Sequence, residues 1–405
     1  MRLFARRSRI AMLLLLPLAA TPATAATATA APVAATVTAV AAETPAPLRT
    51  TADPVPGRYI VTLKPGTASA VRITQQLGVT PLYEYTHVLR GFTAGLSASQ
   101  LTTVRGLPDV AAVEQDAVVT ADPVPAGPNP LAYAASWGLD RIDQPYLPLN
   151  QQFNVNSSGA GATAYVLDTG IDYHHPEFGG RAVPGFDAMG DGRNGQDCNG
   201  HGTHVAGTVG GATFGVARQA TLVSVRVLGC DGRGSYAGMI AGMDWVARNA
   251  KQPAVLNGSL GGPRSDALNQ AATALSDKGV LPVVAAGNDS VDACTVSPAS
   301  AARVLTVGAT DYLDRETDFS NFGTCLDLYA PGAAILSARL GGGSVALNGT
   351  SMAGPHVAGV AALLKARYPA ATPAQVYTWL VEQSVKDILT VTKSSPNRLL
   401  QTAGL

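Results

Sequence analysis

Beyond residue 160, the sequence alternates between short apolar runs and longer stretches with helical periodicity, and this alternation constrains the fold more than any other feature. The runs that indicate strands or helices span residues 162–167, 221–228, 236–248, 254–260, 265–278, 280–285, 304–310, 351–368 and 373–384. Strands that alternate with helices form a parallel sheet, and the helices then cover both faces of that sheet. We therefore predict an α/β fold with a central, mostly parallel sheet and functional residues at the carboxyl ends of its strands.

The first residues indicate export from the cell. Residues 1–25 combine an arginine-rich start, an apolar run and a small-residue site, which together are typical of a secretory signal peptide. The apolar run is too short to span a bilayer, so we expect a secreted product without a membrane anchor. Residues 26–56 consist almost entirely of Ala, Thr, Pro and Val without apolar periodicity, and we predict a disordered spacer there.

A small α+β domain is predicted over residues 57–120. The pattern indicates a strand at 58–63, a helix at 67–77, two strands within 82–96, a helix ending near Gly106 and a last strand at 110–119. Ser97 and Gln100 form a capping box for the second helix. The order βαββαβ is that of a ferredoxin-like unit. The proline-rich residues 121–130 then predict a linker, followed by the α/β domain at 131–405.

Charge and cysteine content narrow the function classes. The chain carries 28 basic and 28 acidic side chains, so no net field would attract nucleic acid. Its four cysteines should be paired in an oxidising compartment, and four cysteines formally permit three connectivities. Because sequence neighbours usually pair, we predict the disulfides Cys198–Cys230 and Cys294–Cys325. A metal site is the alternative, but neither C-x-x-C spacing nor clustered histidines support it.

Three residues far apart in the sequence suit nucleophilic catalysis. Asp168 follows an apolar strand, so its carboxylate should project from a strand end, although a turn aspartate is the simpler reading. His204 lies in N-G-H-G-T-H-V-A-G, where it would open a helix, and Ser351 lies at the start of a long helix. A serine hydroxyl attacks only when an imidazole takes its proton and a carboxylate orients that imidazole. We predict Asp168 as the orienting group, His204 as the base and Ser351 as the nucleophile.

The segments around these residues resemble a known family. The blocks D-T-G, H-G-T-H-V-A-G and G-T-S-M-A resemble the signature blocks of the subtilase family, and W-G-L-D-R-I-D is similar to its proteinase K-like branch; they occupy residues 168–170, 201–207, 349–353 and 137–143. Residues 57–120 resemble the inhibitory pro-region of the same family. The resemblance implies a monomeric serine endopeptidase that cleaves proteins and peptides, with its own pro-domain as an intramolecular inhibitor and a processing site in the linker.

The resemblance also implies the remaining site residues. Asn288 and the backbone N–H of Ser351 would stabilise the oxyanion. The peptide substrate would lie between two extended segments and above an open pocket, and the residues implied are Gly232, Gly234, Tyr236, Ser259, Leu260, Gly261, Ala285 and Gly287. An open pocket favours an apolar or aromatic side chain before the cut. Gly354 and Gly258 stand where the family has larger residues, and both are expected beside the pocket.

Calcium is the structural cofactor that the resemblance implies. A tight site would use the Asp327 carboxylate with the backbone oxygens of Ala302 and Val304, which suits a hard cation. A second site would use Asp140, Asp143 and Gln144 with Asn150 and Gln152, where relatives carry small hydroxyl residues. Solvated carboxylates are the alternative for both sets. Asp187, Asp191 and Asp197 lack EF-hand spacing and are predicted to be loop residues.

Two other functions fit this sequence less well than that of a peptidase. An esterase or lipase places its serine before the acid and the histidine, within G-x-S-x-G, whereas this chain has the order Asp, His, Ser and an alanine at position 353. A binding module without activity is disfavoured because each catalytic position carries a competent side chain.

Overall fold

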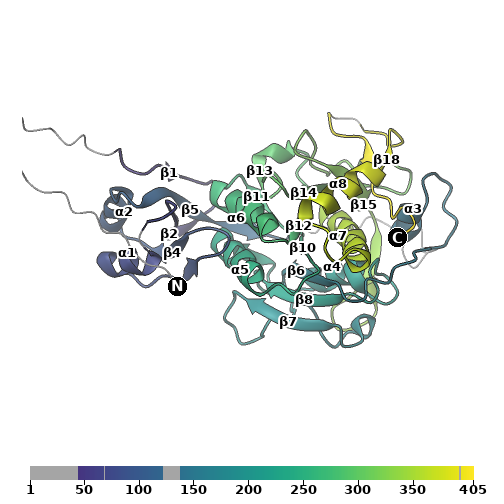
Figure 1. The fold of residues 1–405 in the computed structure, drawn as a ribbon, viewed down its shortest axis with the longest axis horizontal. Coiled ribbons are helices and arrows are strands. Elements are labelled where there is room, and N and C mark those ends of the chain that lie inside the picture. Colours follow the sequence, from purple (N-terminus) through teal and green to yellow (C-terminus); the bar gives the residue numbers. More distant parts are fainter. Residues whose placement is uncertain (1–43, 68, 122–136, 392–393) are drawn as a thin grey trace, which may run out of the picture. The chain divides into compact units, whose positions relative to one another are not determined.

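The computed structural model describes residues 44–67, 69–121, 137–391 and 394–405 (Figure 1). The predicted signal peptide, 1–25, and the spacer up to residue 43 lie outside the described residues. Of the predicted linker, 121–130, only Ala121 is described.

The smaller unit has the predicted βαββαβ order. Its elements are β1 (Leu48–Arg49), β2 (Pro54–Leu63), α1 (Ala70–Leu77), β3 (Tyr83–Tyr85), β4 (Gly91–Gly95), α2 (Ala98–Arg105) and β5 (Val110–Thr120). The sheet order β1-β5-β2-β4-β3 is ferredoxin-like apart from the added edge strand β1. The capping box at α2 is confirmed, because Gln100 N donates to the Ser97 side chain while Ser97 N donates to that of Gln100.

The boundary of the predicted spacer is wrong, because residues 44–56 belong to the smaller unit. β1 pairs in parallel with β5, with Leu48 opposite Val113, and the Ala46 N–H donates to the Arg105 carbonyl at 2.7 Å. β2 begins at Pro54, before the predicted start of the domain. An edge strand is held by backbone hydrogen bonds, which need no apolar alternation, so side-chain periodicity could not reveal it.

The larger unit contains the predicted mostly parallel sheet. Its helices and strands are α3 (Trp137–Asp143), β6 (Thr163–Asp168), η1 (Pro176–Phe178), β7 (Ala182–Asp187), α4 (His201–Gly210), β8 (Thr221–Arg226), β9 (Arg233–Ser235), α5 (Tyr236–Asn249), β10 (Ala254–Gly258), β11 (Gly262–Pro263), α6 (Asp266–Asp277), β12 (Leu281–Ala285), η2 (Ala293–Thr295), β13 (Val296–Ser297), β14 (Leu305–Thr310), β15 (Leu328–Pro331), β16 (Ile335–Ala338), β17 (Ser344–Leu347), α7 (Thr350–Arg367), α8 (Pro373–Gln383), β18 (Val385–Lys386) and β19 (Arg398–Leu399). The main sheet has the order β18-β19-β15-β14-β12-β10-β6-β8-β7, and β18 is antiparallel to β19.

Helices cover both faces of this sheet, as predicted (Figure 1). The alternation within β6 shows how the two faces form. Ala164 and Val166 pack in the core that includes residues of α4 and α7, whereas Tyr165 and Leu167 pack in the core that includes residues of α5 and α6. Because side chains of a strand alternate between faces, a strand buried on both sides is continuously apolar.

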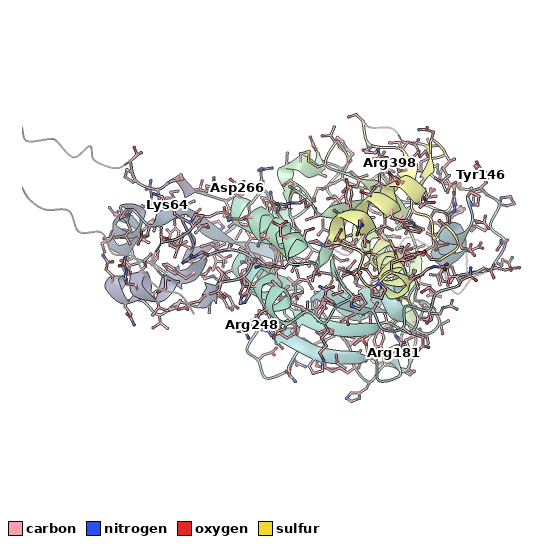
Figure 2. All side chains as sticks on the ribbon, viewed as in Figure 1. Lys64, Tyr146, Arg181, Arg248, Asp266 and Arg398 are labelled. Carbon is pink, nitrogen blue, oxygen red and sulfur yellow. A yellow bond between two sulfur atoms is a disulfide. The ribbon has the colours of Figure 1, made fainter. Side chains whose placement is uncertain are left out.

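Covalent and ionic links add to this packing. The predicted disulfides Cys198–Cys230 and Cys294–Cys325 are both present. Asp266, the first residue of α6 (Figure 2), forms an ion pair with Arg49 of β1 at 2.8 Å. This pair joins the smaller unit to the larger one, although partly exposed ion pairs contribute little stability.

Candidate functional site

The predicted site residues lie where neighbouring parallel strands end. Asp168 is the last residue of β6, Ser259 follows β10, and Asn288 follows β12 by three residues. β10 lies between β6 and β12 and runs parallel to both. The three residues therefore share one edge of the sheet, as expected for α/β folds.

Asp168 forms a buried hydrogen bond with His201. The carboxylate Oδ1 of Asp168 lies 2.7 Å from Nδ1 of His201, and both side chains are almost completely buried. The same oxygen accepts the N–H of Thr169, also at 2.7 Å. This contact fixes the ring of His201, which is the first residue of α4, at the carboxyl end of β6.

Asp168 contacts His201 and not His204. The geometry therefore contradicts the prediction that His204 is the base oriented by Asp168. Its Nε2 lies 3.0 Å from the carbonyl oxygen of Ile335 and 3.1 Å from that of Val345, in a fully buried position within α4. Two histidines three residues apart lie on neighbouring positions of one helix, so the sequence block alone did not discriminate between them. The discriminating signal is position, because His201 opens the helix beside a strand end whereas His204 lies one turn inside.

Asp197 holds the start of α4 in place. Its Oδ1 accepts hydrogen bonds from Thr169 Oγ1 at 2.9 Å and from the Gly200 N–H at 3.1 Å, and its Oδ2 accepts from the Thr203 N–H at 3.0 Å. Thr169 directly follows Asp168, so this carboxylate ties the end of β6 to the helix that carries His201. Asp197 was predicted only as a loop residue, and its spacing in the sequence gives no sign of this anchoring role.

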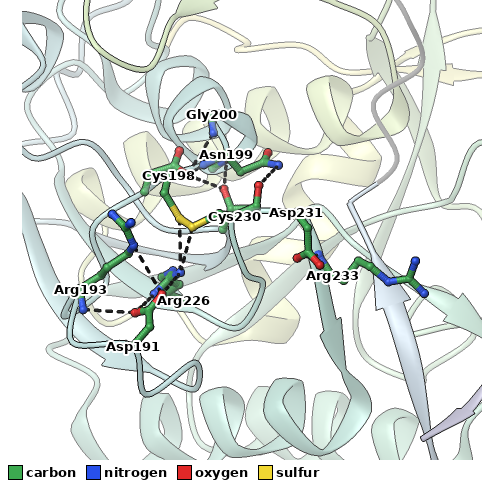
Figure 3. The surroundings of a disulfide bond; sticks show 12 residues. Asp191, Arg193, Cys198, Asn199, Gly200, Arg226, Cys230, Asp231 and Arg233 are labelled. Atoms are coloured by element: carbon green, nitrogen blue, oxygen red, sulfur yellow. Dashed lines mark hydrogen bonds and ion pairs between the residues drawn. A yellow bond between two sulfur atoms is a disulfide. The ribbon is translucent and has the colours of Figure 1, made fainter.

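A second network of charged side chains lies beside the first disulfide (Figure 3). The Arg226 guanidinium is fully buried, and it contacts Asp187 at 3.0 Å and Asp191 at 2.6 Å. It also lies 3.4 Å from the sulfur of Cys198. Asp191, predicted to be a loop residue, and Asp187, which ends β7 rather than lying in a loop, thus neutralise the charge of a buried arginine.

Ser351 lies at the start of α7, on the same edge of the sheet. Its Oγ donates to the Ser259 carbonyl at 3.1 Å. Asn288 Oδ1 accepts from the N–H and the hydroxyl of Thr350 at 2.8 and 2.9 Å, which attaches the asparagine to the start of that helix. A cleft of about 580 Å³ is lined by Ser351, Asn288, Ser259, Leu260, Gly261, Ala285 and Gly287 among others.

The end of β5 lies along this cleft as an extended strand. Val119 pairs with Gly234 of β9, Thr120 forms a bridge with Gly261, and the N–H of Ala121 donates to the Gly232 carbonyl at 2.9 Å. Tyr236, the first residue of α5, is buried and donates its hydroxyl to the Pro263 carbonyl. The segments predicted to flank a substrate therefore already flank a chain in extended conformation.

Of the three residues predicted to form the first calcium site, the structure places only two in the lining of one cavity. Asp327 and Val304 line a cavity of about 410 Å³, but the Ala302 carbonyl accepts a hydrogen bond from Thr273 Oγ1 at 2.9 Å. Burial raises the pKa of the Asp327 carboxyl, whose oxygens accept from Tyr377 Oη and from the Thr306 N–H. A hard cation prefers carboxylate and carbonyl oxygens, and because both oxygens of Asp327 already accept hydrogen bonds, this calcium site stays a prediction.

The carboxylates of the second predicted calcium site accept hydrogen bonds from the backbone of a single loop, residues 150–154. Asp140 accepts the backbone N–H groups of Asn150 and Gln151, and Asp143 Oδ2 accepts that of Asn154. Asp143 Oδ1 is buried without a hydrogen-bond partner among the described residues, so this oxygen is available as a cation ligand. Gln144 instead donates its amide to the carbonyls of Tyr146 and Pro148. Across the described part of the chain, no group of three or more His, Cys, Asp or Glu side chains is placed to hold a metal.

Two buried histidines should make the fold sensitive to acid. Burial lowers the pKa of His204 from 6.5 to about 3 and that of His356 to about 4. The folded state keeps both rings neutral, whereas the unfolded chain protonates them below its pKa of about 6.5. The stability linked to these two histidines is therefore fully present above pH 6.5 and is lost as the pH falls toward their pKa values in the folded state. We expect the free energy of unfolding to drop by about 2 kcal/mol per histidine between pH 6.5 and 4.5.

Urea unfolding of the Ser351→Ala precursor, which avoids self-digestion, would measure this loss at several pH values. His356→Gln removes one of the two titrating rings and should remove roughly half of the loss. An unchanged pH dependence in that variant would contradict the assignment.

Comparisons with known proteins match both units. Residues 159–404 match the subtilase family, Peptidase S8, and residues 58–122 match peptidase inhibitor I9. The chain is 48% identical over 316 residues to alkaline serine exoprotease A of Vibrio alginolyticus, covering 78% of this chain and 59% of that relative, so it spans less than two thirds of that protein. It is 45% identical over 375 residues to an extracellular serine proteinase of Thermus sp. (strain Rt41A), covering 86% and 90% of the two chains. The solved structure of a cold adapted subtilisin-like serine proteinase is 49% identical, with a TM-score of 0.65, and the match covers 66% of this chain and 97% of that chain.

Proposed function

Since the chain belongs to the subtilase family of serine endopeptidases, we propose that it is a secreted enzyme that hydrolyses peptide bonds through an acyl-enzyme on Ser351. The observation that carries this proposal is the 2.7 Å pair of Asp168 and His201 on the sheet edge that also bears Ser259 and Asn288. A buried carboxylate on one ring nitrogen leaves the other nitrogen to serve as base. Secretion is supported by the similarity to the Thermus relative, an extracellular serine proteinase.

The mechanism assigns His201 the role that the sequence suggested for His204. His201 takes the proton of Ser351 during attack and returns it to the leaving amine, while Asp168 fixes the tautomer and stabilises the imidazolium. In the structure the Ser351 hydroxyl donates to Ser259, so it must rotate toward His201 before attack. The Ser351 N–H and the Asn288 amide then bind the oxyanion.

The substrate binds as a strand between 232–236 and 259–262. Support comes from the end of β5, which pairs with β9 and bridges Gly261 in this manner. Main-chain pairing tolerates many sequences. Ala285 and Gly287 leave the wall of the cleft open, which favours an apolar or aromatic side chain before the cut. The same contacts support inhibition by the pro-domain, which occupies the cleft until it is cut.

Cleavage of casein and of a peptide library by the processed, secreted protein tests the proposal. Cleavage sites read by mass spectrometry would define the residue preferred before the cut, and turnover of simple esters without that of peptides would favour an esterase instead. Ser351→Ala is the matched control, since it should accumulate as an unprocessed precursor and cleave nothing. Self-trimming by that variant would refute the mechanism.

We further propose calcium as a structural cofactor, held by Asp327 with Val304 and by Asp140 with Asp143. Bound calcium would neutralise these buried carboxylates and link the loops that carry them. A ligand at 100 times its Kd stabilises the folded state by about 2.7 kcal/mol, so chelation should lower the unfolding temperature by roughly 5 to 10 °C.

Calorimetry with and without a chelator measures this effect. Asp327→Ala and Asp143→Ala separate the two sets, because each variant should lose the part of the response that its own set provides. A chelator that leaves the wild-type transition unchanged would refute both assignments.

None of the described helices is both long enough and apolar enough to cross a membrane.

A further inference from the structure

The helix that carries Ser351 lacks one of its own hydrogen bonds. In an α-helix the carbonyl of residue 351 accepts the N–H of residue 355. Residue 355 is a proline inside α7, and proline has no N–H to donate. The carbonyl of Ser351, which is buried with its residue, therefore needs a partner from outside the helix.

Ser259 supplies that partner. Its Oγ donates to the Ser351 carbonyl at 2.9 Å, from the position directly after β10. A serine hydroxyl has one proton, so Ser259 Oγ can only accept from any further polar neighbour. Asn257 fills this place, because its Nδ2 donates to Ser259 Oγ at 2.8 Å. The result is a series of two hydrogen bonds, in which Asn257 donates to Ser259 and Ser259 donates to the carbonyl of Ser351.

The residues around these two hydrogen bonds exclude water from them and hold Asn257 and Ser259 close to α7. Asn257 and Ser259 are fully buried. A Cβ on Gly354 would lie 3.4 Å from Asn257 Oδ1 and 3.8 Å from Ser259 Oγ, so both residues pack in van der Waals reach of this turn of α7. Asn257 Oδ1 has no partner within the described residues, so the amide is fixed mainly by its bond to Ser259.

We propose that Asn257 and Ser259 are positioning residues that replace the hydrogen bond removed by Pro355 and so fix the backbone of Ser351. The proposal rests on the proposed function of Ser351 as nucleophile. Ser351 contributes its hydroxyl and its N–H to the reaction, and the rotation of its backbone sets the direction of both. Small misplacements of a reacting group cost large factors in rate, so the rate of acylation depends on this anchor.

Restoring the missing N–H provides a direct test. Pro355→Ala gives residue 355 a donor for the Ser351 carbonyl, after which the Ser259 hydroxyl becomes redundant. We expect Ser259→Ala alone to lower kcat about tenfold with KM within about twofold, since the main-chain contacts of residue 259 remain. In the Pro355→Ala background the same substitution should lower kcat less than about threefold.

This double-mutant cycle of positions 259 and 355 is measured on self-processed enzyme. A covalent serine reagent counts the active sites, so that kcat is calculated per folded active site and misfolded protein is not included. A tenfold loss in both backgrounds, or a loss confined to KM, would overturn the proposal. If Ser259→Ala yields no folded enzyme, Asn257→Ala takes its place in the same cycle, with an expected loss of about threefold that Pro355→Ala again removes.

The free energy of unfolding of the same cycle, measured in the inactive Ser351→Ala precursor, separates this proposal from the proposed function. The proteins compared are the parent, the two single variants and the double variant. A coupling between positions 259 and 355 in that inactive background supports the hydrogen-bond replacement even if the wild type cleaves no peptide, whereas additive effects would overturn it. Absence of peptidase activity in the wild type would refute the proposed function alone.

Discussion

His201→Ala is expected to lower kcat by about 10⁶-fold, the magnitude measured for the corresponding histidine of subtilisin itself. The Asp168–His201 pair at 2.7 Å is the reason, because within the described part of the chain His201 is the base that this carboxylate orients. The variant should also remain a precursor, since self-processing uses the same chemistry. Initial rates with a chromogenic peptide and gel analysis of processing would measure both effects.

His204→Gln is the matched control, because it changes the other histidine of the same helix. His204 contacts two backbone carbonyls rather than a carboxylate, so we expect kcat to stay within about tenfold while the protein loses about 1 to 3 kcal/mol of stability. The reverse pattern, a small effect at 201 and an abolished rate at 204, would reinstate the assignment made from the sequence.

Asp116→Ala should weaken inhibition by the pro-domain about 100-fold. Asp116 lies on β5, is fully buried, and accepts hydrogen bonds from Arg58 Nε and from the N–H of Ala237 at 2.9 Å. Ala237 belongs to the first turn of α5, where an orphan N–H and the helix dipole favour a negative charge. Removal of the carboxylate leaves the Ala237 N–H of the larger unit without its charged acceptor, a loss of up to about 3 kcal/mol, which corresponds to roughly that factor in affinity.

The inhibition constant of the added segment 44–121 against the processed enzyme measures this effect. Asp109→Ala is the control, because Asp109 pairs with exposed Arg72 within the same unit and should leave inhibition unchanged. Equal inhibition by both variants would show that β5 binds through its main chain alone. Glu114 on the same strand accepts from Ser265 and Ala267 at the start of α6 and is expected to behave like Asp116.

Local patterns in the sequence determined the central strands and the helices that cover them, in their order along the chain. Continuous apolar runs such as that of β6 identified strands buried on both faces, and the Ser97 capping box marked the start of α2. Because a strand in a parallel sheet carries functional groups at its carboxyl end, the place of Asp168 followed from the run before it. The disulfide pairs followed from spacing, since neighbouring cysteines close short loops.

Tertiary structure decided which groups meet. His201 and His204 share one helix and one sequence block, and only the packing of α4 against the end of β6 places the first of them on Asp168. The same holds for residues 44–56, for Arg226 between its two aspartates, and for Ser259 beneath the Ser351 carbonyl. Periodicity and capping depend on neighbours within a few residues, whereas these contacts join distant segments whose distance is set by the whole packed core.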